Sequence, residues 1–189
     1  RLDGFNFKRL NDCFKLHTQI VTNHFSEIIK SMVEMHNTVA KVFEDNKEVL
    51  EIFECTDEFS DTQNFCDHYG FDIEDSCNAI LIKAKKPEEF YAMFCVLGST
   101  RLDVNTKAKN AMGAKRVSFA SREEAEQVTN QIYGGISPLG LPENLKIFID
   151  ENVMDREKLF IGAGNRVSKF FLSPELLVEL TKADVLDLT

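Results

Sequence analysis

Glycine and proline are distributed unevenly along this chain, and their distribution limits the folds that it can adopt. Neither residue occurs between Gly4 and Gly70, where apolar side chains recur at the spacing of a helix. From about Ser60 onward, helix caps, glycines and prolines divide the sequence into short segments that suit strands, turns and brief helices. We therefore expect a helical amino-terminal extension, residues 1–47, followed by one mixed α/β domain, residues 48–189.

The extension is expected to form either two packed helices or one long helix that contacts a partner chain. A second copy of this chain is one candidate partner, which would give a homodimer held through these helices. His17 and His24 lie near the apolar face of the pattern. Structural histidines fit this pattern better than metal ligands.

The following domain is expected to be built on a curved, mixed sheet with helices between the strands. A weak strand pattern at 49–55 precedes six further short apolar runs, at 79–82, 91–97, 116–119, 146–149, 159–161 and 167–172. The predicted helix starts are Ser60, Asp103, Ser121 and Ser173. Ser121 has a glutamate three residues later, as a capping box requires, and Gly70 is placed to end the first of these helices.

The composition suits one globular domain with a core, because 43% of the 189 residues are apolar and 28% are charged. No run approaches about 18 consecutive apolar residues. The amino terminus also lacks a basic segment followed by an apolar one. We expect neither a membrane span nor a secretory signal, and a cytoplasmic location.

Cysteine usage agrees with a reducing compartment, because the five cysteines are an odd number and form no C-x-x-C pair. A zinc site built from Cys55, Cys66, His68 and Cys77 is an alternative, but their spacings match no zinc finger or ribbon. Buried thiols that pack as small hydrophobic groups are the preferred interpretation. We predict that the protein uses no metal and no cofactor.

The net charge of −9 argues against a protein that grips long stretches of nucleic-acid backbone, since such binding relies on lysine and arginine. Basic residues nevertheless gather locally. They form two clusters, Lys83, Lys85 and Lys86, and Lys107, Lys109, Lys115 and Arg116. Contact with phosphates and plain solvated surface charge are equally good interpretations of each cluster.

The segment Gly134-Gly135-Ile136-Ser137-Pro138-Leu139-Gly140 is the most unusual stretch of the sequence. A loop of this kind lets backbone N–H groups approach a ligand closely. It therefore suits an oxyanion site, in which fixed donors hold the charge that develops when water attacks an ester carbonyl. The same residue pairs also form ordinary turns, so the motif alone does not identify a site.

A second glycine-containing turn runs from Gly162 to Arg166 between two predicted strands. It lacks the G-x-G-x-x-G spacing of a dinucleotide site, and a hairpin turn is the simpler interpretation. Arg166, at its exit, is a candidate for binding a phosphate or carboxylate, or for a surface ion pair. No G-x-S-x-G elbow, H-E-x-x-H motif or P-loop is present, so motifs alone indicate no reaction.

Taken in order, these segments resemble the YbaK and prolyl-tRNA-synthetase-associated domain family. The resemblance runs over about residues 57–182 and is carried by 78–82, 94–97, 111–117, 121–129, the Gly-Gly-Ile-Ser-Pro-Leu-Gly loop and the 162–166 turn. It implies a barrel-like α/β fold. It also implies hydrolysis of the ester that joins a wrongly attached amino acid to tRNA, without a metal or a covalent acyl-enzyme.

The resemblance also implies roles for the glycine loop. The backbone N–H of Gly134 is expected to bind the carbonyl oxygen of the substrate. Gly135, Ile136, Ser137 and Pro138 are expected to shape the pocket wall beside it. The implied partners are the acceptor end of an aminoacyl-tRNA and prolyl-tRNA synthetase or another synthetase.

One departure from the family concerns its principal charged side chain. Many members carry a lysine at the position of Asn78, which adds no positive charge and is expected to position rather than activate a group. We hypothesise that Lys169 supplies the missing charge, although a solvent-facing lysine on a strand is the simpler interpretation. Phe59 aligns loosely with an aromatic residue of the substrate pocket, and Arg166 is included as a substrate-binding candidate.

Two functions follow from these observations. The first is a deacylase that removes a small amino acid such as Ala, Cys or Ser from tRNA, with tRNA-Pro as the expected carrier. The second is a catalytically weak or inactive module that binds tRNA or a synthetase, with the amino-terminal helices as its docking element. The intact loop favours the first function, and the lost lysine and the acidic charge favour the second.

Overall fold

The computed structural model of the chain describes residues 35–189. His17, His24 and most of the predicted extension, including any dimer contact made through it, lie outside the described residues. The longer helices are α2 (Asn37–Asn46), α3 (Thr62–Tyr69), α5 (Arg122–Thr129) and α6 (Pro174–Thr181). The shorter helical segments are η1 (Asp57–Phe59), η2 (Ile73–Asp75), η3 (Val104–Ala108), α4 (Lys109–Ala111) and η4 (Glu151–Asp155).

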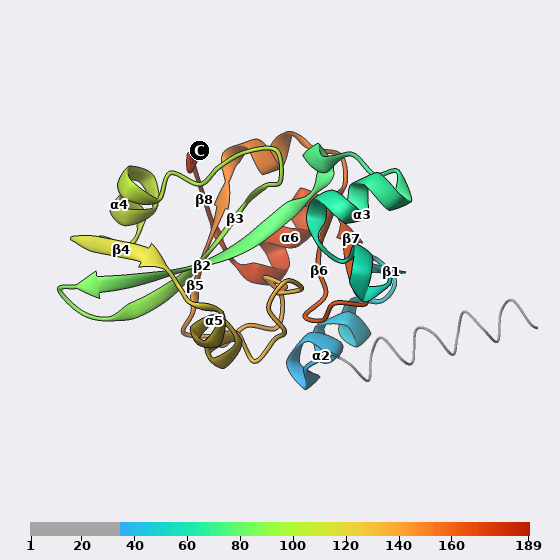
Figure 1. Cartoon of the computed structure of the whole chain (residues 1–189), viewed down its shortest axis with the longest axis horizontal. Helices are drawn as coiled ribbons and strands as arrows, with labels where there is room; N and C mark the ends of the chain where they lie inside the picture. The colour runs from blue at the N-terminus through green and yellow to red at the C-terminus, as the bar shows by residue number, and fades with distance from the viewer. Residues whose placement is uncertain (1–34) are drawn as a thin grey trace, which may run out of the picture.

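The larger of two sheets has five strands in the order β4-β2-β3-β5-β8 (Figure 1). These are β2 (Cys77–Lys86), β3 (Phe90–Leu97), β4 (Arg116–Phe119), β5 (Lys146–Asp150) and β8 (Asp184–Leu186). β2 pairs antiparallel with β3 and β4, whereas β3–β5 and β5–β8 are parallel, so the sheet is mixed as expected. β2 and β3 contain the predicted runs at 79–82 and 91–97 and form an antiparallel hairpin, and β8 was missed.

The smaller sheet has three antiparallel strands in the order β1-β7-β6. They are β1 (Glu51–Glu54), β6 (Leu159–Gly162) and β7 (Ser168–Leu172). Ser76, just before β2, forms a bridge with Phe160 of β6, which brings the two sheets together where β2 begins. The described residues thus confirm the mixed α/β class, with two adjoining sheets that do not close into a barrel.

The hydrophobic core lies on both faces of the larger sheet, because side chains alternate between faces along a strand. Met93 and Cys95 of β3 face a cluster that includes α2, α6 and the smaller sheet, whereas Phe94 and Val96 face η3 and α4. β3 is buried on both faces and so reads as a continuous apolar run rather than an alternating one.

An aromatic cluster joins α3 to the smaller sheet. Its members are Phe53, Phe65, Tyr69, Phe71, Phe160 and Phe171. Phe65 is fully buried and stacks on Phe71, with ring centroids 5.6 Å from Phe53 and 5.2 Å from Phe71. This packing sets the position of α3, whose first residues border the site described below.

α2 belongs to the segment that we predicted as an extension, and it packs against the domain. Phe43 stacks on Phe170 of β7 with centroids 5.6 Å apart, and the buried Val39 lies against the turn at Gly140. The division of the chain at residues 47 and 48 stays a prediction.

The predicted helix starts are confirmed at Asp103, Ser121 and Ser173 and wrong at Ser60, and Gly70 ends α3 as predicted. Ser121 forms a capping box with Glu124, and Ser173 caps α6 ahead of Pro174. α3 instead begins after Asp61, and Ser60 is buried one residue earlier as the end of η1. Ser60 was misassigned because Ser and Asp are both good N-cap residues, so local propensity does not choose between neighbours. None of the helices in residues 35–189 has the length and apolar character needed to cross a bilayer.

Candidate functional site

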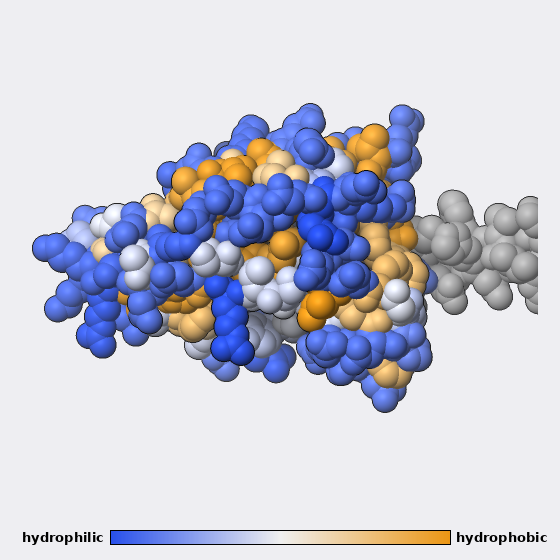
Figure 2. All heavy atoms as spheres, turned by 90° about the horizontal axis from the view of Figure 1, so that it is seen from above, coloured by the Kyte–Doolittle hydropathy of each residue, from blue (hydrophilic) through white to orange (hydrophobic). Residues whose placement is uncertain are grey.

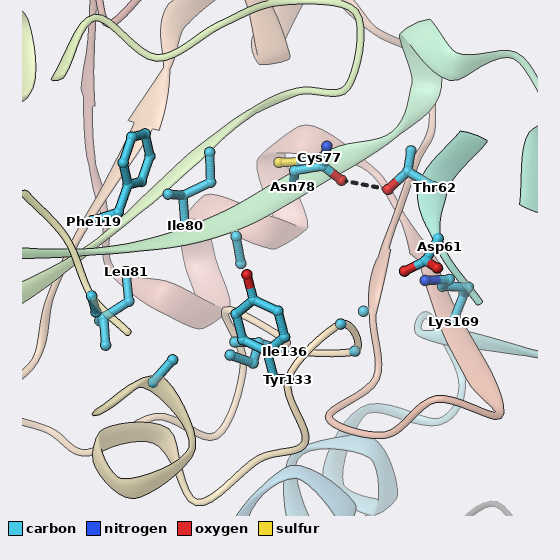
Figure 3. A pocket seen from close by; sticks show the side chains of 16 residues that line it. Asp61, Thr62, Cys77, Asn78, Ile80, Leu81, Phe119, Tyr133, Ile136 and Lys169 are labelled. Carbon is cyan, nitrogen blue, oxygen red and sulfur yellow. Dashed lines mark hydrogen bonds between the residues drawn. The ribbon is translucent and has the colours of Figure 1, made fainter. Parts of the chain in front are cut away.

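A cavity of about 370 Å³ lies beside the edge of β2 (Figure 3). β4 pairs with β2 only from Ile82 onward, and Ala120 donates a last backbone hydrogen bond to the carbonyl of Leu81 at 3.0 Å. Asn78 to Leu81 therefore line the cavity from an edge of β2 that β4 leaves uncovered. The loop after α5, the first residues of α3 and β7 form its other walls.

Gly134 lines this cavity in a conformation that favours glycine, with φ at +86°. Its backbone N–H has no hydrogen-bond partner among the described residues, whereas Gly135 N–H donates to the carbonyl of Ile132 at 3.0 Å. A Cβ at Gly134 would also overlap the guanidinium of Arg166. The structure thus places Gly134, the residue that the sequence singled out, in the cavity wall, and its N–H has no partner among residues 35–189.

The two glycine turns pack backbone to backbone. A Cβ at Gly135 would overlap the carbonyl oxygen of Asn165, and a Cβ at Gly162 would overlap that of Gly135. Two hydrogen bonds join the turns, from Gly164 N–H to Gly135 O at 2.8 Å and from Ile132 N–H to Gly164 O at 3.1 Å. Glycine is required at Gly135 and Gly162 because no side chain fits between the loops.

Ser137 and Pro138, expected in the pocket wall, do not line the cavity. Ser137 is fully buried and its hydroxyl accepts from Leu139 N–H at 3.1 Å, while Pro138 borders a different depression. Gln131 holds this turn, because its side chain accepts from Ser137 N–H at 2.6 Å and donates to Leu139 O at 3.0 Å. The sequence offered no signal for Gln131, since its partners depend on how the loop folds back.

Asn78 faces the cavity with a fixed amide. Thr62, the first residue of α3, donates its hydroxyl to Asn78 Oδ1 at 2.8 Å, as the dashed line in Figure 3 shows. With the oxygen engaged in this way, the amide NH₂ of Asn78 is left as a donor. Thr62 was not among the predicted site residues, because its contact comes from packing of α3 against β2.

Lys169 also lines the cavity, and its side chain is only 5% exposed. Its ammonium donates to the carbonyl of Ser60 at 2.6 Å and lies 5.6 Å from the centroid of Phe65. Burial lowers the pKa of Lys169, against the opposing influence of Cys55 and Asp61. The solvent-facing alternative for this lysine is wrong, although the role that we assigned to it stays a prediction.

Arg166 and Phe59 lie outside the cavity lining. Arg166 forms ion pairs with Asp57 and with Asp61, the latter at 3.5 Å, and its guanidinium lies behind Gly134. The hydrogen bond with Asp57 raises the pKa of Arg166 above its ordinary value. Phe59 stacks on His68 with centroids 3.7 Å apart. The structure therefore brings together Asn78, Gly134, Gly135, Ile136 and Lys169, and leaves the other four predicted residues around them.

The cysteines of this region are unsuited to nucleophilic chemistry. Cys77 lines the cavity, but a hydrogen bond with Cys95 and burial raise the pKa of its thiol well above 9.0. The thiolate is the reactive form, so a raised pKa keeps the group inert. Within residues 35–189, no three His, Cys, Asp or Glu side chains are placed to hold a metal ion, so the grouping of Cys55, Cys66, His68 and Cys77 does not form there.

Residues 35–189 form a mixed α/β domain with a small pocket, which is lined by Gly134 with no described partner for its N–H, by the fixed amide of Asn78 and by the buried Lys169. The model of the aminoacyl-tRNA editing domain family matches residues 56–180. The chain belongs to this family, which confirms the resemblance inferred from the order of its segments.

Individual relatives match shorter stretches. A protein of Enterococcus faecalis named as a candidate Cys-tRNA(Pro)/Cys-tRNA(Cys) deacylase, EbsC, is 29% identical over 92 residues, which cover 49% of this chain and 56% of the relative. A proline–tRNA ligase of Nautilia profundicola is 33% identical over 113 residues, or 59% of this chain and 19% of the ligase. The chain thus spans about half of the first and a fifth of the second.

Solved structures agree on the fold. The crystal structure of a candidate trans-editing enzyme for prolyl-tRNA synthetase superposes with a TM-score of 0.70 at 22% identity. The match covers 82% of this chain and 98% of that structure. At this level of identity the similarity establishes the architecture, and the function has to be argued from the cavity.

Proposed function

We propose that this chain hydrolyses the ester bond between a wrongly attached amino acid and the terminal ribose of a tRNA. The observation that carries the proposal is the free backbone N–H of Gly134 at the cavity wall. When water attacks an ester carbonyl, negative charge develops on its oxygen, and a donor already in place stabilises that charge without reorganisation. The family to which the chain belongs supports this reaction.

Asn78 and Lys169 are assigned supporting roles. The amide NH₂ of Asn78, held by Thr62, donates a hydrogen bond to a substrate hydroxyl or to the attacking water. The ammonium of Lys169 places positive charge in the same cavity, where the family often has a lysine on the β2 strand instead. No covalent intermediate is required, which agrees with the raised pKa of the Cys77 thiol.

The substrate is proposed to carry a small amino acid on tRNA-Pro. A cavity of about 370 Å³ is at the small end of ligand pockets, and it must take an amino acid together with part of the ribose. Cysteine is supported by the name of the Enterococcus faecalis relative, and alanine and serine are of similar size. The relatives that are proline–tRNA ligases support that synthetase as the source of the mischarged tRNA and as a partner.

A panel of charged tRNAs tests the proposal. We expect hydrolysis of at least one of Ala-, Ser-, Thr- and Cys-charged tRNA-Pro, measured as loss of labelled amino acid from the tRNA. We expect Gly134→Ala to reduce this rate at least 10-fold, because the added Cβ strains a residue at φ +86° and displaces the donor.

Gly113→Ala is the matched control. Gly113 also has a positive φ, +60°, but a Cβ there meets no atom within 4 Å. It should therefore reproduce the backbone strain and retain activity. Absence of turnover on every tRNA of the panel would overturn the deacylase and leave the alternative, a module that binds tRNA or a synthetase.

A further inference from the structure

Two aromatic rings are exposed at the mouth of the cavity. The side chain of Phe119 is 61% exposed and that of Tyr133 is 49% exposed, and both line the cavity. The other large hydrophobic residues exposed within residues 35–189 do not line it. Exposed aromatic side chains beside a polar cavity are typical of a surface that contacts a ligand.

Tyr133 is held in place by α5. Its backbone N–H donates to Glu126 Oε1 at 3.1 Å, and the same carboxylate oxygen pairs with Arg122 Nε at 3.2 Å. The Arg122 guanidinium lies 5.9 Å from the ring centroid of Tyr133. The ring is thus backed by a cation and anchored through its own backbone, so little order has to be gained when a ligand stacks on it.

The cavity is polar at one end and apolar at the other. Figure 3 shows Asp61, Thr62, Asn78 and Lys169 at one end and Phe119, Ile80 and Leu81 at the other, with Tyr133 and Ile136 between them. The polar end suits the ester and the amino acid. The aromatic end suits a flat, weakly polar group attached to the same molecule.

β4 connects this aromatic end to a basic tip, defined as Lys85, Lys86, Lys115 and Arg116. Arg116 begins β4 and Phe119 ends it, so the tip lies about 10 Å along the strand from the mouth. Arg116 pairs with Lys86 in register, and Lys115 N–H donates to Lys86 O at 2.9 Å. Figure 2 shows mostly hydrophilic residues over this end of the molecule.

The charges of the tip are available to a ligand. All four side chains are exposed and none forms an ion pair with another described residue. The adjoining turn carries Glu88 and Glu89, and Glu89 is paired with Lys83. A protein with a net charge of −9 therefore has a local cationic site in line with its cavity.

We infer that Phe119 and Tyr133 form a stacking surface for the terminal nucleobase of the RNA, while the basic tip binds the phosphates that precede it. Every base has a flat face, so aromatic stacking holds single-stranded RNA without reading its sequence. With its base on this stacking surface, the terminal nucleotide places its ribose ester at Gly134. This inference rests on the proposed function for its substrate, an RNA 3′ end.

Binding of a short RNA tests the stacking surface without any need for catalysis. The first probe is a fluorescent single-stranded oligonucleotide that ends in CCA. The second, abasic probe is the same oligonucleotide with the nucleobase of its last nucleotide removed. The intact chain should bind the first more tightly. Phe119→Leu combined with Tyr133→Leu should weaken binding of the complete probe by roughly 5- to 150-fold, the range for one lost base stack. The same change should leave the abasic probe unaffected.

Phe90→Leu is the matched control, because Phe90 is 40% exposed but does not line the cavity. Equal affinity for the two probes, or an equal loss in Phe90→Leu, would overturn the inference. Lys86→Gln with Arg116→Gln should weaken both probes alike and reduce the salt dependence of binding. An unchanged salt dependence would show that the basic tip does not bind the phosphates of the RNA.

Deacylation kinetics separate this inference from the proposed function. For a hydrolysed aminoacyl-tRNA, the Phe119 and Tyr133 double variant should raise KM, while hydrolysis of the glyceryl ester of the same amino acid, which has no base, stays unchanged. Loss of both activities would assign the two rings to folding or chemistry instead of base binding. If no ester is hydrolysed but the probes still differ in affinity, the deacylase proposal fails and the stacking surface stands.

Discussion

Lys169 is the only lysine among residues 35–189 whose side chain is buried. Its ammonium is satisfied by one backbone carbonyl, that of Ser60, and by the ring of Phe65. Burying a charge with so few partners costs stability, and burial lowers its pKa accordingly. A cost of this kind is often retained where the charge serves a site, which is why we assign Lys169 to the substrate.

Replacement of Lys169 by methionine tests this assignment. Methionine keeps the length of the stem and removes the charge, so we expect Lys169→Met to fold with a Tm within a few degrees of the parent chain. We expect kcat for deacylation to fall at least 10-fold. The Tm and the single-turnover rate are measured side by side, with Lys158→Met as the control at an exposed lysine. Full activity in Lys169→Met would show that the charge takes no part.

At the scale of elements, the site depends on how closely two turns approach. Gly162 ends β6 with its Cα against the carbonyl oxygens of Gly135 and Ile136. Gly162→Ala must push these backbones apart, and we expect a loss of about 1–3 kcal/mol in the free energy of unfolding, as for other overpacked positions. Urea denaturation checks this value. A loss well below about 1 kcal/mol would argue that the contact is not tight.

An ion pair between Glu124 of α5 and Lys83 of the β2–β3 hairpin predicts that the stability of the fold depends on pH. Hydrogen bonds from Lys83 and from Ser121 N–H lower the pKa of Glu124 from 4.5 to about 2. A carboxylate whose pKa is lowered by folding stabilises the folded state above its unfolded pKa, and this stabilisation is lost as the pH falls towards 2. Glu124→Gln should therefore lower Tm at pH 7, and the difference should shrink between pH 5 and pH 2.

Thermal unfolding across that pH range gives the measurement. Glu175→Gln is the control, because Glu175 is exposed and forms no ion pair with another residue of 35–189. A Tm difference for Glu124→Gln that stays constant down to pH 2 would contradict the assigned ion pair.

At the scale of the whole molecule, the net charge of −9 limits the affinity of the chain for RNA. The basic tip is a small cluster on an acidic chain, so the isolated chain should hold only the acceptor end of tRNA, and a synthetase or another factor would supply further affinity. We expect weak binding of intact tRNA with a shallow dependence of log Kd on log salt concentration. Tight binding with a steep salt slope, measured by fluorescence anisotropy, would show that the chain contacts many phosphates.

The strands and helix caps were largely predictable because their signals are local. The apolar runs of β2 and β3 and the capping box at Ser121 depend on residues that are close in the sequence. β8 was missed because three exposed residues carry no pattern of their own, and its pairing with β5 joins segments far apart in the chain. Ser60 was wrongly predicted as the N-cap of α3 because it stands next to Asp61, and both residue types are good N-caps.

The site was predictable only in part. Gly134 and Gly135 stood out because glycine pairs are rare and marked a turn, and Asn78 and Lys169 came from the family resemblance. Thr62, Gln131, Tyr133 and Phe119 gave no signal, because each acts through a neighbour that only the fold supplies. The sequence by itself determined the class of fold and the glycine turn, which follow from local backbone preferences. The tertiary structure decided that Lys169 is buried and that two aromatic rings border the cavity, because burial and proximity arise from contacts between distant segments.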